Sequence, residues 1–272
     1  MNGVRPARGQ RMSSAPVGPR RSRGAALRRW LLILPLAAAG AAWFWFVVLP
    51  WPILLRWRHP RSTAFQRMRV HEARAQAERL DLRYTWVPLN RISRNLQRAV
   101  ITGEDGRFYE HDGIDWEALR EEFRYRGDDE FSWFDPADLR ALWNTLDHYR
   151  RNRAGIRGRS TITQQLAKNL YFSSDRSVLR KFEELIVARR MEFLLPKDRI
   201  LELYLNVAEW GPGVFGAEAA ARHYFNRAAA RLSLDQAAAL AATLPHPLTS
   251  NPKYRPGRMN WRKAYILRLM GA

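Results

Sequence analysis

The sequence of 272 residues contains no cysteine. This absence excludes a disulfide-stabilised scaffold, a thiolate metal site and a cysteine nucleophile. Acidic residues are few, because 26 Asp and Glu stand against 46 Lys and Arg, and the formal net charge is +20. A chain this basic favours a phosphate-rich partner, and nucleic acid, anionic lipid and a phosphorylated substrate all qualify. Apolar residues make up 46% of the chain, which is enough for a hydrophobic core and excludes disorder throughout.

Residues 1–29 lack acidic side chains and carry eight arginines among Pro, Gly, Ser and Ala. Such a segment cannot bury enough apolar surface to offset the entropy lost on ordering it. We therefore predict a disordered basic arm over residues 1–29.

Ionisable side chains are also absent from Leu31 to Leu55, a run of 25 residues. A helix of this length reaches roughly 37 Å and crosses a hydrocarbon core of about 30 Å. Trp30 and Trp51 lie near its ends, where indole rings favour the headgroup layer. We predict a transmembrane anchor over residues 30–55. A cleavable signal peptide is the alternative, because residues 37–41 are small, but the apolar run continues further than such a peptide needs.

The distribution of arginines around this run predicts its orientation. Eight arginines precede it, and fewer follow closely after it. The later ones are Arg56, Arg58, Arg61, Arg67 and Arg69. Because basic flanks stay on the cytoplasmic side, the arm is expected inside and the rest of the chain outside.

The remaining chain predicts a linker or short helix over residues 56–85 and a mainly α domain over residues 86–272. Two capping-box patterns, at Ser233–Gln236 and Thr161–Gln164, mark helix starts. No run of alternating β-branched residues indicates a large sheet. Residues 121–151 combine an aromatic loop with a short amphipathic helix and form a distinct segment.

Three clusters could carry chemistry. Glu104 and Asp105 follow an apolar helical stretch with His111 nearby, which suits a general base or a charged helix end before a glycine turn. Residues 158–169 place hydroxyls at a helix start and a lysine beyond, which suits an oxyanion or phosphate ligand or a capped surface helix. Residues 180–184 put two cations at a helix start beside Glu184, which suits a bound anion or an ordinary ion pair.

Together these stretches resemble one family, the peptidoglycan glycosyltransferases of family 51, and within it the monofunctional biosynthetic transglycosylases. Residues 104–113 match Glu-Asp-x-x-Phe-x-x-His-x-Gly, and residues 158–169 match Gly-x-Ser-Thr-Ile-Thr-Gln-Gln-Leu-Ala-Lys-Asn. Residues 180–188 match Arg-Lys-x-x-Glu-x-x-x-Ala, and residues 197–206 and 216–225 agree as well. Between the first two motifs the chain is longer than the family pattern, so residues 121–151 look like an insertion.

The resemblance implies a lysozyme-like helical fold and polymerisation of lipid II into β-1,4-linked glycan strands with release of undecaprenyl pyrophosphate. It implies that Glu104 is the general base and that Glu184 assists the leaving group, as an acid or as a ligand of a divalent ion (Mg or Mn). Expected substrate-binding residues are Arg180, Lys181, Ser160, Thr161, Gln164, Gln165, Lys168, Asn169 and Asn206. Expected supporting residues are Asp105, Phe108, His111 and Glu202. No organic cofactor is expected.

The resemblance also implies partners and a location. Lipid II, the growing glycan chain, inner-membrane lipids and the cell-wall synthesis machinery are the expected partners, and nucleic acid is not. The catalytic domain is expected on the periplasmic side of a bacterial inner membrane, behind a single span. A lysozyme-like hydrolase or lytic transglycosylase is the alternative, although cleavage needs no cation cluster for a pyrophosphate. A membrane-tethered DNA- or scaffold-binding protein would leave Glu104 and Glu184 unexplained.

Overall fold

A computed structural model describes residues 23–77, 79–123, 140, 143, 160–172 and 177–272. The chain divides into two compact units, residues 1–49 and residues 50–272. Most of the predicted insertion, including Phe131, Trp133 and Phe134, lies outside the described residues. Within it, Trp143 is 68% exposed and therefore does not pack in the core, as an apolar residue of the predicted amphipathic helix would.

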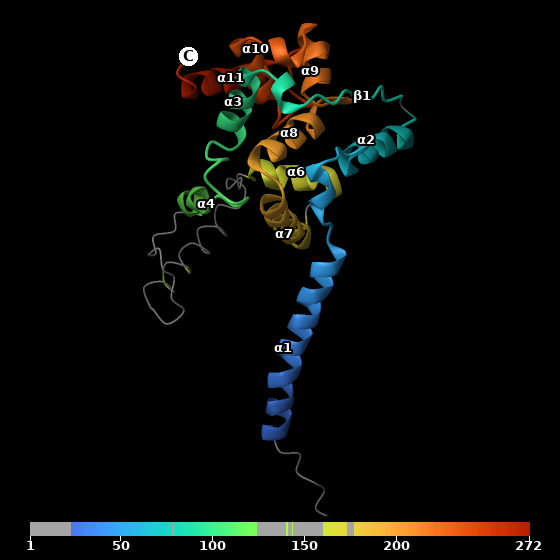
Figure 1. The fold of residues 1–272 in the computed structure, drawn as a ribbon, viewed down its shortest axis with the longest axis vertical. Helices are drawn as coiled ribbons and strands as arrows, with labels where there is room; N and C mark the ends of the chain where they lie inside the picture. The colour runs from blue at the N-terminus through green and yellow to red at the C-terminus, as the bar shows by residue number, and fades with distance from the viewer. Residues whose placement is uncertain (1–22, 78, 124–139, 141–142, 144–159, 173–176) are drawn as a thin grey trace, which may run out of the picture. The chain divides into compact units, whose positions relative to one another are not determined.

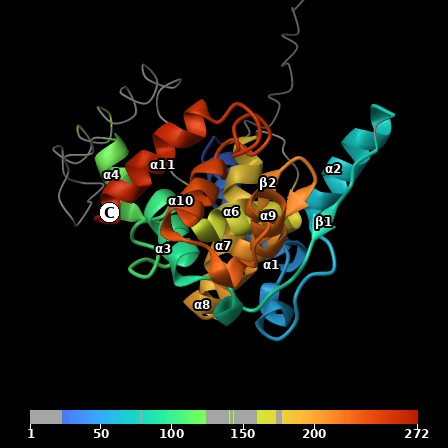
Figure 2. The same cartoon turned by 90° about the horizontal axis from the view of Figure 1, so that it is seen from above.

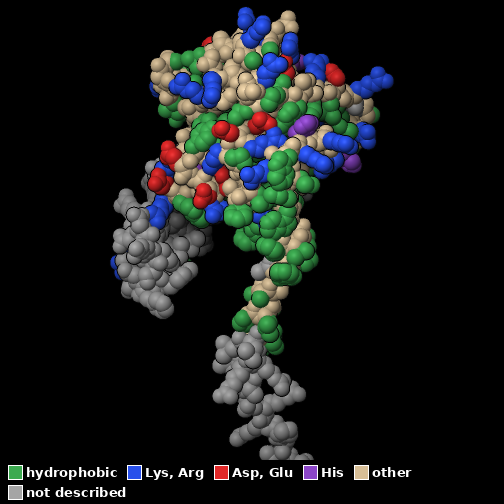
Figure 3. All heavy atoms as spheres, viewed as in Figure 1, with side chains coloured by type: hydrophobic (Ala, Val, Ile, Leu, Met, Phe, Trp, Pro, Cys, Tyr) green, Lys and Arg blue, Asp and Glu red, His purple; other side chains and the backbone are tan. Residues whose placement is uncertain are grey.

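The first unit contains one described element, helix α1 (Arg23–Val48), with Pro35 inside it. Residues 23–29, expected to be disordered, are therefore helical, and good helix formers such as Ala25 and Leu27 favour that outcome. In Figure 3 hydrophobic side chains are visible along the coloured part of α1. The stretch Ile33–Arg56, with a mean hydropathy of 1.9, is long and apolar enough to cross a membrane by length and composition.

The second unit is mainly helical, as predicted, with one small sheet (Figure 1). Its α-helices are α2 (Ala64–Ala75), α3 (Arg94–Glu104), α4 (Trp116–Phe123), α6 (Ile162–Tyr171), α7 (Val178–Leu194), α8 (Lys197–Val207), α9 (Ala217–Phe225), α10 (Leu234–Thr243) and α11 (Gly257–Leu269). Its 3-10 helices are η1 (Pro52–Arg56), η2 (Leu89–Arg91) and η3 (Ala229–Arg231).

The sheet has three short strands, β1 (Arg83–Tyr84), β2 (Glu209–Gly211) and β3 (Val214–Phe215), in the order β1-β3-β2. Strand β3 pairs in parallel with β1 and antiparallel with β2.

The predicted linker over residues 56–85 is part of the second unit rather than a spacer. Thr63 and Gln66 form a complete capping box at the start of α2. From α2, the Arg69 guanidinium donates to both carboxylate oxygens of the buried Glu209, at 2.9 to 3.2 Å. Because removing one partner of such a buried pair is costly, this contact ties the segment to the sheet.

Packing between helices places the functional residues. Helix α6 packs against α7 and α8, and α3 packs against α10 and α11 (Figure 2). Ile162, Leu166 and Leu170 on α6 are buried, as their spacing predicts. The opposite, polar face of α6 is therefore turned toward the start of α7 and the end of α3.

Candidate active site

Glu104 is the last residue of α3. Leu96, Ala99 and Val100 bury the apolar face of this helix, so its C-terminal end is held against the core. The Glu104 carboxylate accepts hydrogen bonds from Gln165 Nε2 (2.9 Å) and Arg262 Nη2 (3.0 Å), one at each oxygen. Burial raises the pKa of Glu104, and these two donors oppose the rise. The result is a carboxylate that binds a proton more readily than an exposed one.

The start of α6 links the other parts of the site. Thr161 is its N-cap and accepts the Gln164 N–H, while the Thr161 hydroxyl donates to the Gly113 carbonyl (2.7 Å). Gln164 Nε2 donates to the same carbonyl (2.9 Å), so the predicted capping box is only half formed. Thr161 and Gln164 were expected to bind substrate. Both are buried, and the Thr161 hydroxyl and the Gln164 amide hold the loop at Gly113.

Lys181 and Glu184 lie in the first turns of α7, which Ser177 caps. Lys181 Nζ donates to Ser160 Oγ (2.8 Å) and Gln164 Oε1 (3.1 Å), and it lies 3.4 Å from Glu184. The buried Glu184 carboxylate also pairs with Arg180. Burial lowers the pKa of Lys181, because a charged ammonium loses hydration there.

Glu104 and Glu184 therefore belong to one polar network. Gln165 Nε2 donates to Glu104 and also to the Ser160 carbonyl (3.1 Å), and the Ser160 hydroxyl receives Lys181. The network thus runs from the end of α3 through the start of α6 to the start of α7. The predicted mechanism requires the two glutamates to belong to one site, and this network joins them.

The negative charges of Glu184 and Glu104 both act on the Lys168 ammonium group. Its side chain makes no hydrogen bond or ion pair within the described part of the chain. Burial lowers the pKa of Lys168. Together with Gln165 and Asn169 it lines a cavity of about 380 Å³, beside Tyr204, whose hydroxyl donates to Gln165 Oε1 (2.9 Å). A partly dehydrated, unpaired cation on a cavity wall is suited to bind an anionic ligand.

Asn206 and Glu202 lie outside this network. The Asn206 carboxamide is fully buried and bonds both the N–H and the carbonyl of Val87, at 3.0 and 2.8 Å. It therefore supports the chain before η2, and substrate binding by Asn206 stays a prediction. Glu202 accepts the Leu89 N–H (2.9 Å) and pairs with Arg199, which serves the same segment.

Asp105 follows Glu104 but points to different partners. Its Oδ2 accepts the N–H of Ile162, the first residue of α6 (2.9 Å), and its Oδ1 accepts His111 Nε2 (2.9 Å). The ring nitrogen on the other side, His111 Nδ1, accepts the Gly113 N–H (3.0 Å), which places the proton on Nε2. Asp105 and His111 thus hold the start of α6 against the loop that follows Glu104.

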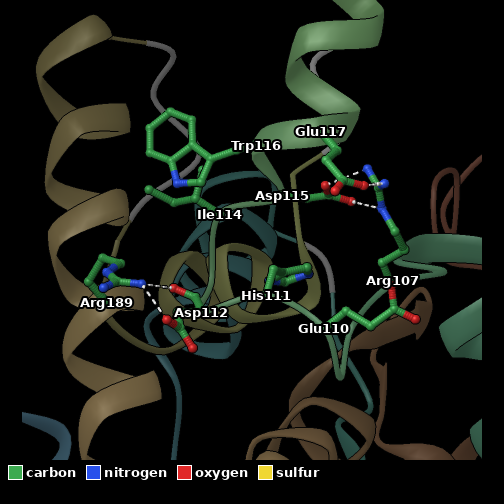
Figure 4. Close-up of a pocket in the computed structure, with 9 residues that line it drawn as sticks. All are labelled: Arg107, Glu110, His111, Asp112, Ile114, Asp115, Trp116, Glu117 and Arg189. Carbon is green, nitrogen blue, oxygen red and sulfur yellow. Dashed lines mark hydrogen bonds and ion pairs between the residues drawn. The ribbon is translucent and has the colours of Figure 1, made fainter. Parts of the chain in front are cut away.

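The cavity beside His111 is about 290 Å³ (Figure 4), and most of the charged side chains that line it pair with one another. Arg107 binds Asp115 through two hydrogen bonds of 2.7 and 3.1 Å and also contacts Glu117. Arg189 pairs with the Asp112 carboxylate at 3.4 Å and donates to the Asp112 carbonyl at 2.6 Å. Phe108 is fully buried behind this loop, with Lys197 Nζ 4.5 Å from its ring centroid.

Metal ligation has little support in these contacts. Among the described residues, Asp105, His111 and Asp115 are the one cluster of three potential ligands, with their atoms within 4.8 Å of one another. Those atoms already bind Ile162, Gly113 and Arg107 or one another. Glu184, the predicted metal ligand, has two cations beside it. The described side chains therefore do not fit a resident divalent ion.

Arg262 is a contact of Glu104 that sequence reasoning missed. It lies in α11, 158 residues further along the chain, and donates to Gly103 as well as to Glu104. Arg262 also lies beyond the motifs that carry the family resemblance, so no local spacing pointed to it.

Glu104 and the buried Glu184, joined through a glutamine-rich helix start and faced by lysine and arginine, suit a class of enzyme that combines a general base with cations for an anionic ligand. The comparisons agree with that class. Residues 72–271 match the family model described as Transglycosylase, and the chain belongs to this family.

Relatives support the assignment over most of the chain. The biosynthetic peptidoglycan transglycosylase of Bordetella pertussis is 44% identical over 240 residues, which cover 88% of this chain and 90% of the relative. The protein of the same name from Bordetella avium is 47% identical over 78% of this chain and 81% of the relative. That of Herminiimonas arsenicoxydans is 38% identical over 89% and 94%.

Proposed function

We propose that this protein is a peptidoglycan glycosyltransferase that polymerises lipid II into β-1,4-linked glycan strands and releases undecaprenyl pyrophosphate. The observation that carries the proposal is the continuous network from Glu104 through Gln165, Ser160 and Lys181 to Glu184. Family membership and the names of the relatives support the substrate class.

In the proposed reaction, Glu104 takes the proton from the 4-hydroxyl of the acceptor sugar. The hydroxyl oxygen forms a bond to C1 of the donor sugar as the bond from C1 to the pyrophosphate breaks, with inversion at C1. A positioned general base contributes about 10²- to 10⁴-fold to the rate. The raised pKa of Glu104 suits this task, because it brings the proton affinity of the base closer to neutral pH.

The departing pyrophosphate takes the electron pair and the negative charge. Lys181 and Arg180 pair with that charge, and Lys168 reaches the same region from α6. These cations are held in place before the reaction by Ser160 and Glu184, so little reorganisation is needed when charge develops. Glu184 pairs with Arg180 and Lys181 and holds their side chains in position. It assists the leaving group either through these two cations or by protonating the pyrophosphate.

A divalent ion at Glu184 stays a prediction. With Arg180 and Lys181 beside that carboxylate, such an ion would have to arrive with the pyrophosphate, whose oxygens would supply most of its ligands. No step of the proposed reaction depends on it.

The proposed location is a bacterial inner membrane, with the second unit on the periplasmic side. The apolar stretch Ile33–Arg56 supports anchoring, and the arginine-rich residues before it support the orientation. Because both sugar substrates carry lipid tails, anchoring the enzyme would confine enzyme and substrates to one plane. A lipid-interface role for Phe131, Trp133 and Phe134 stays a prediction.

The test is incubation of the purified full-length chain in detergent or vesicles with lipid II, with and without the phosphoglycolipid inhibitor moenomycin. We expect moenomycin-sensitive polymer and release of undecaprenyl pyrophosphate. The same assay is made on Glu104→Gln, which should form little polymer because its side chain cannot take the proton. Its matched control is Glu110→Gln, which should stay near wild type because Glu110 is an exposed acid on the following loop. Solubilisation of cell-wall sacculi without polymer from lipid II would instead support the hydrolase alternative and overturn the proposal.

A further inference from the structure

Arg262 is held beside Glu104 by the packing of α11. Ile266, one turn further along α11, is fully buried against Gly103. A Cβ atom at Gly103 would lie 2.9 Å from Ile266 Cδ1, closer than side-chain carbons approach, so glycine is what lets α11 come this near. Lys263 on the same helix pairs with Asp235 at the start of α10. The position of Arg262 is therefore set by the fold.

The Glu104 carboxylate lies between two donors from different helices. Arg262 binds Oε1 from α11, and Gln165 binds Oε2 from α6. Gln165 is itself oriented by the hydroxyl of Tyr204 on α8. Two donors at opposite oxygens define the plane of the carboxylate, and the lone pairs that remain are the ones that can accept a substrate proton.

Charge and burial act on Glu104 in opposite directions. Burial raises its pKa, and the charge of Arg262 is the largest influence that lowers it. The other groups facing Glu104 are Lys168 on α6, whose charge acts the same way more weakly, and the neutral Tyr204 on α8. Without Arg262, a buried Glu104 would hold its proton to a higher pH and be a poorer acceptor at neutral pH.

Burying the Arg262 guanidinium in this position costs free energy. Its Nε is buried and makes no hydrogen bond within the described part of the chain. A buried donor left without a partner is destabilising. That the side chain nevertheless lies here is consistent with a gain from Glu104 and the Gly103 carbonyl that offsets the loss.

We propose that Arg262 is a positioning residue for glycosyl transfer, which orients the Glu104 carboxylate and keeps it ionised until the acceptor hydroxyl arrives. This inference rests on the proposed function. During the step, the acceptor O–H bond breaks, the proton moves to Glu104, and Arg262 keeps its own charge and its bond to Gly103. Arg262 touches neither sugar nor pyrophosphate in this account.

The test compares the pH dependence of lipid II polymerisation by wild type, Arg262→Gln, Arg262→Lys and the control Lys263→Gln. We expect Arg262→Gln to lower kcat about 10- to 100-fold at pH 7, with KM within about twofold, and to recover activity as the pH rises. Arg262→Lys keeps the charge and should shift the acidic limb less. Lys263→Gln, which removes only a surface contact of the same helix, should keep the wild-type profile.

Thermal melts of each variant identify loss of folding, and Arg262→Lys serves as the readout where Arg262→Gln does not fold. An acidic limb that stays at the wild-type pH in the folded variants would overturn the inference, as would an equal loss of kcat at every pH. A wild type that makes no polymer would overturn the proposed function instead, so the two failures are distinguishable.

Discussion

Glu104 and Asp105 are neighbours in the chain and yet belong to two different networks. Asp105 is satisfied within the protein, because His111 and the first N–H of α6 occupy its two oxygens. Glu104 lies at the carboxyl end of α3, where the helix dipole disfavours an acid, and it is buried beside the cations Arg262 and Lys168. We call the contacts of Asp105 with His111 and Ile162 the scaffold network, and in it both carboxylate oxygens have partners. In the Glu104 network, the Lys168 ammonium and lone pairs of the Glu104 carboxylate have no hydrogen-bond partner among the described residues.

The difference teaches where chemistry is expected in a site rich in charge. A network in which each donor and acceptor has a partner holds elements together and has nothing left to offer a ligand. The Glu104 network differs because burial raises the pKa of Glu104 and lowers that of Lys168. These two groups can still bind a substrate. The predictions that follow test this division of labour.

The largest effect is expected for Glu104→Gln. Glutamine keeps the shape and one acceptor oxygen but cannot take a proton. We expect the initial rate of lipid II polymerisation to fall about 10²- to 10⁴-fold, while Glu110→Gln stays near wild type. An equal loss of rate in the two variants would contradict the assignment of Glu104 as the general base.

A loss of about 10²- to 10³-fold in kcat is expected when the leaving-group cation is removed in Lys181→Met. The ammonium bridges Ser160, Gln164 and Glu184, so a neutral side chain leaves the pyrophosphate charge less compensated. Release of undecaprenyl pyrophosphate in a single turnover measures this step. Glu183→Gln, on the same helix turn, is the control, and a comparable loss there would indicate damage to α7 instead.

The pH profile of kcat should be a narrow bell. The pKa of Glu104 is raised, so activity should fall, as pH decreases, at a pH above the value of about 4.3 for an ordinary glutamate. The pKa values of Lys181 and Lys168 are lowered, so the alkaline fall should come below about 10.4. Limbs at the ordinary values would show that burial does not tune these groups.

Asp105→Asn should act on stability first. Asparagine has one acceptor oxygen and no charge, so it cannot accept hydrogen bonds from both His111 and Ile162. We therefore expect the free energy of unfolding, measured in urea, to fall by about 1.5–3 kcal/mol. Glu104→Gln should cost less. A reversed order of the two variants would contradict the distinction between a closed scaffold and an open site.

The smallest effect is expected for Asp115→Asn, at the edge of the scaffold network. Its partner Arg107 is 29% exposed, so the ion pair is screened by solvent and contributes about 0–1 kcal/mol. Polymerisation should stay near wild type. A large loss of activity would place the His111 cavity within the working site.

The sequence predicted local features of the site well. The apolar spacing of α6 and the serine cap of α10 both appear, because each depends on residues within two turns of a helix. The mainly helical class followed for the same reason. The likeness of the motifs to one family supplied the function, which the spacing of Glu104, Ser160 and Lys181 alone would have left open.

Contacts between distant parts of the chain could not be read from local patterns. Nothing near Arg262 indicates that it meets Glu104, and nothing near Arg69 indicates Glu209. The internal partners of buried motif residues could not be predicted either. Asn206 binds the Val87 backbone, and Thr161 and Gln164 bind Gly113, because fully buried polar groups must find partners inside the protein.

The most direct measurement is equilibrium binding of lipid II to Glu104→Gln, made on the same preparation that is assayed for polymer. If Glu104 only receives the proton, affinity should stay within about threefold of wild type while the rate of polymer formation falls about 10²- to 10⁴-fold. Lost affinity would make Glu104 a binding residue, and turnover close to wild type would assign the proton to another group. Either result would contradict the account.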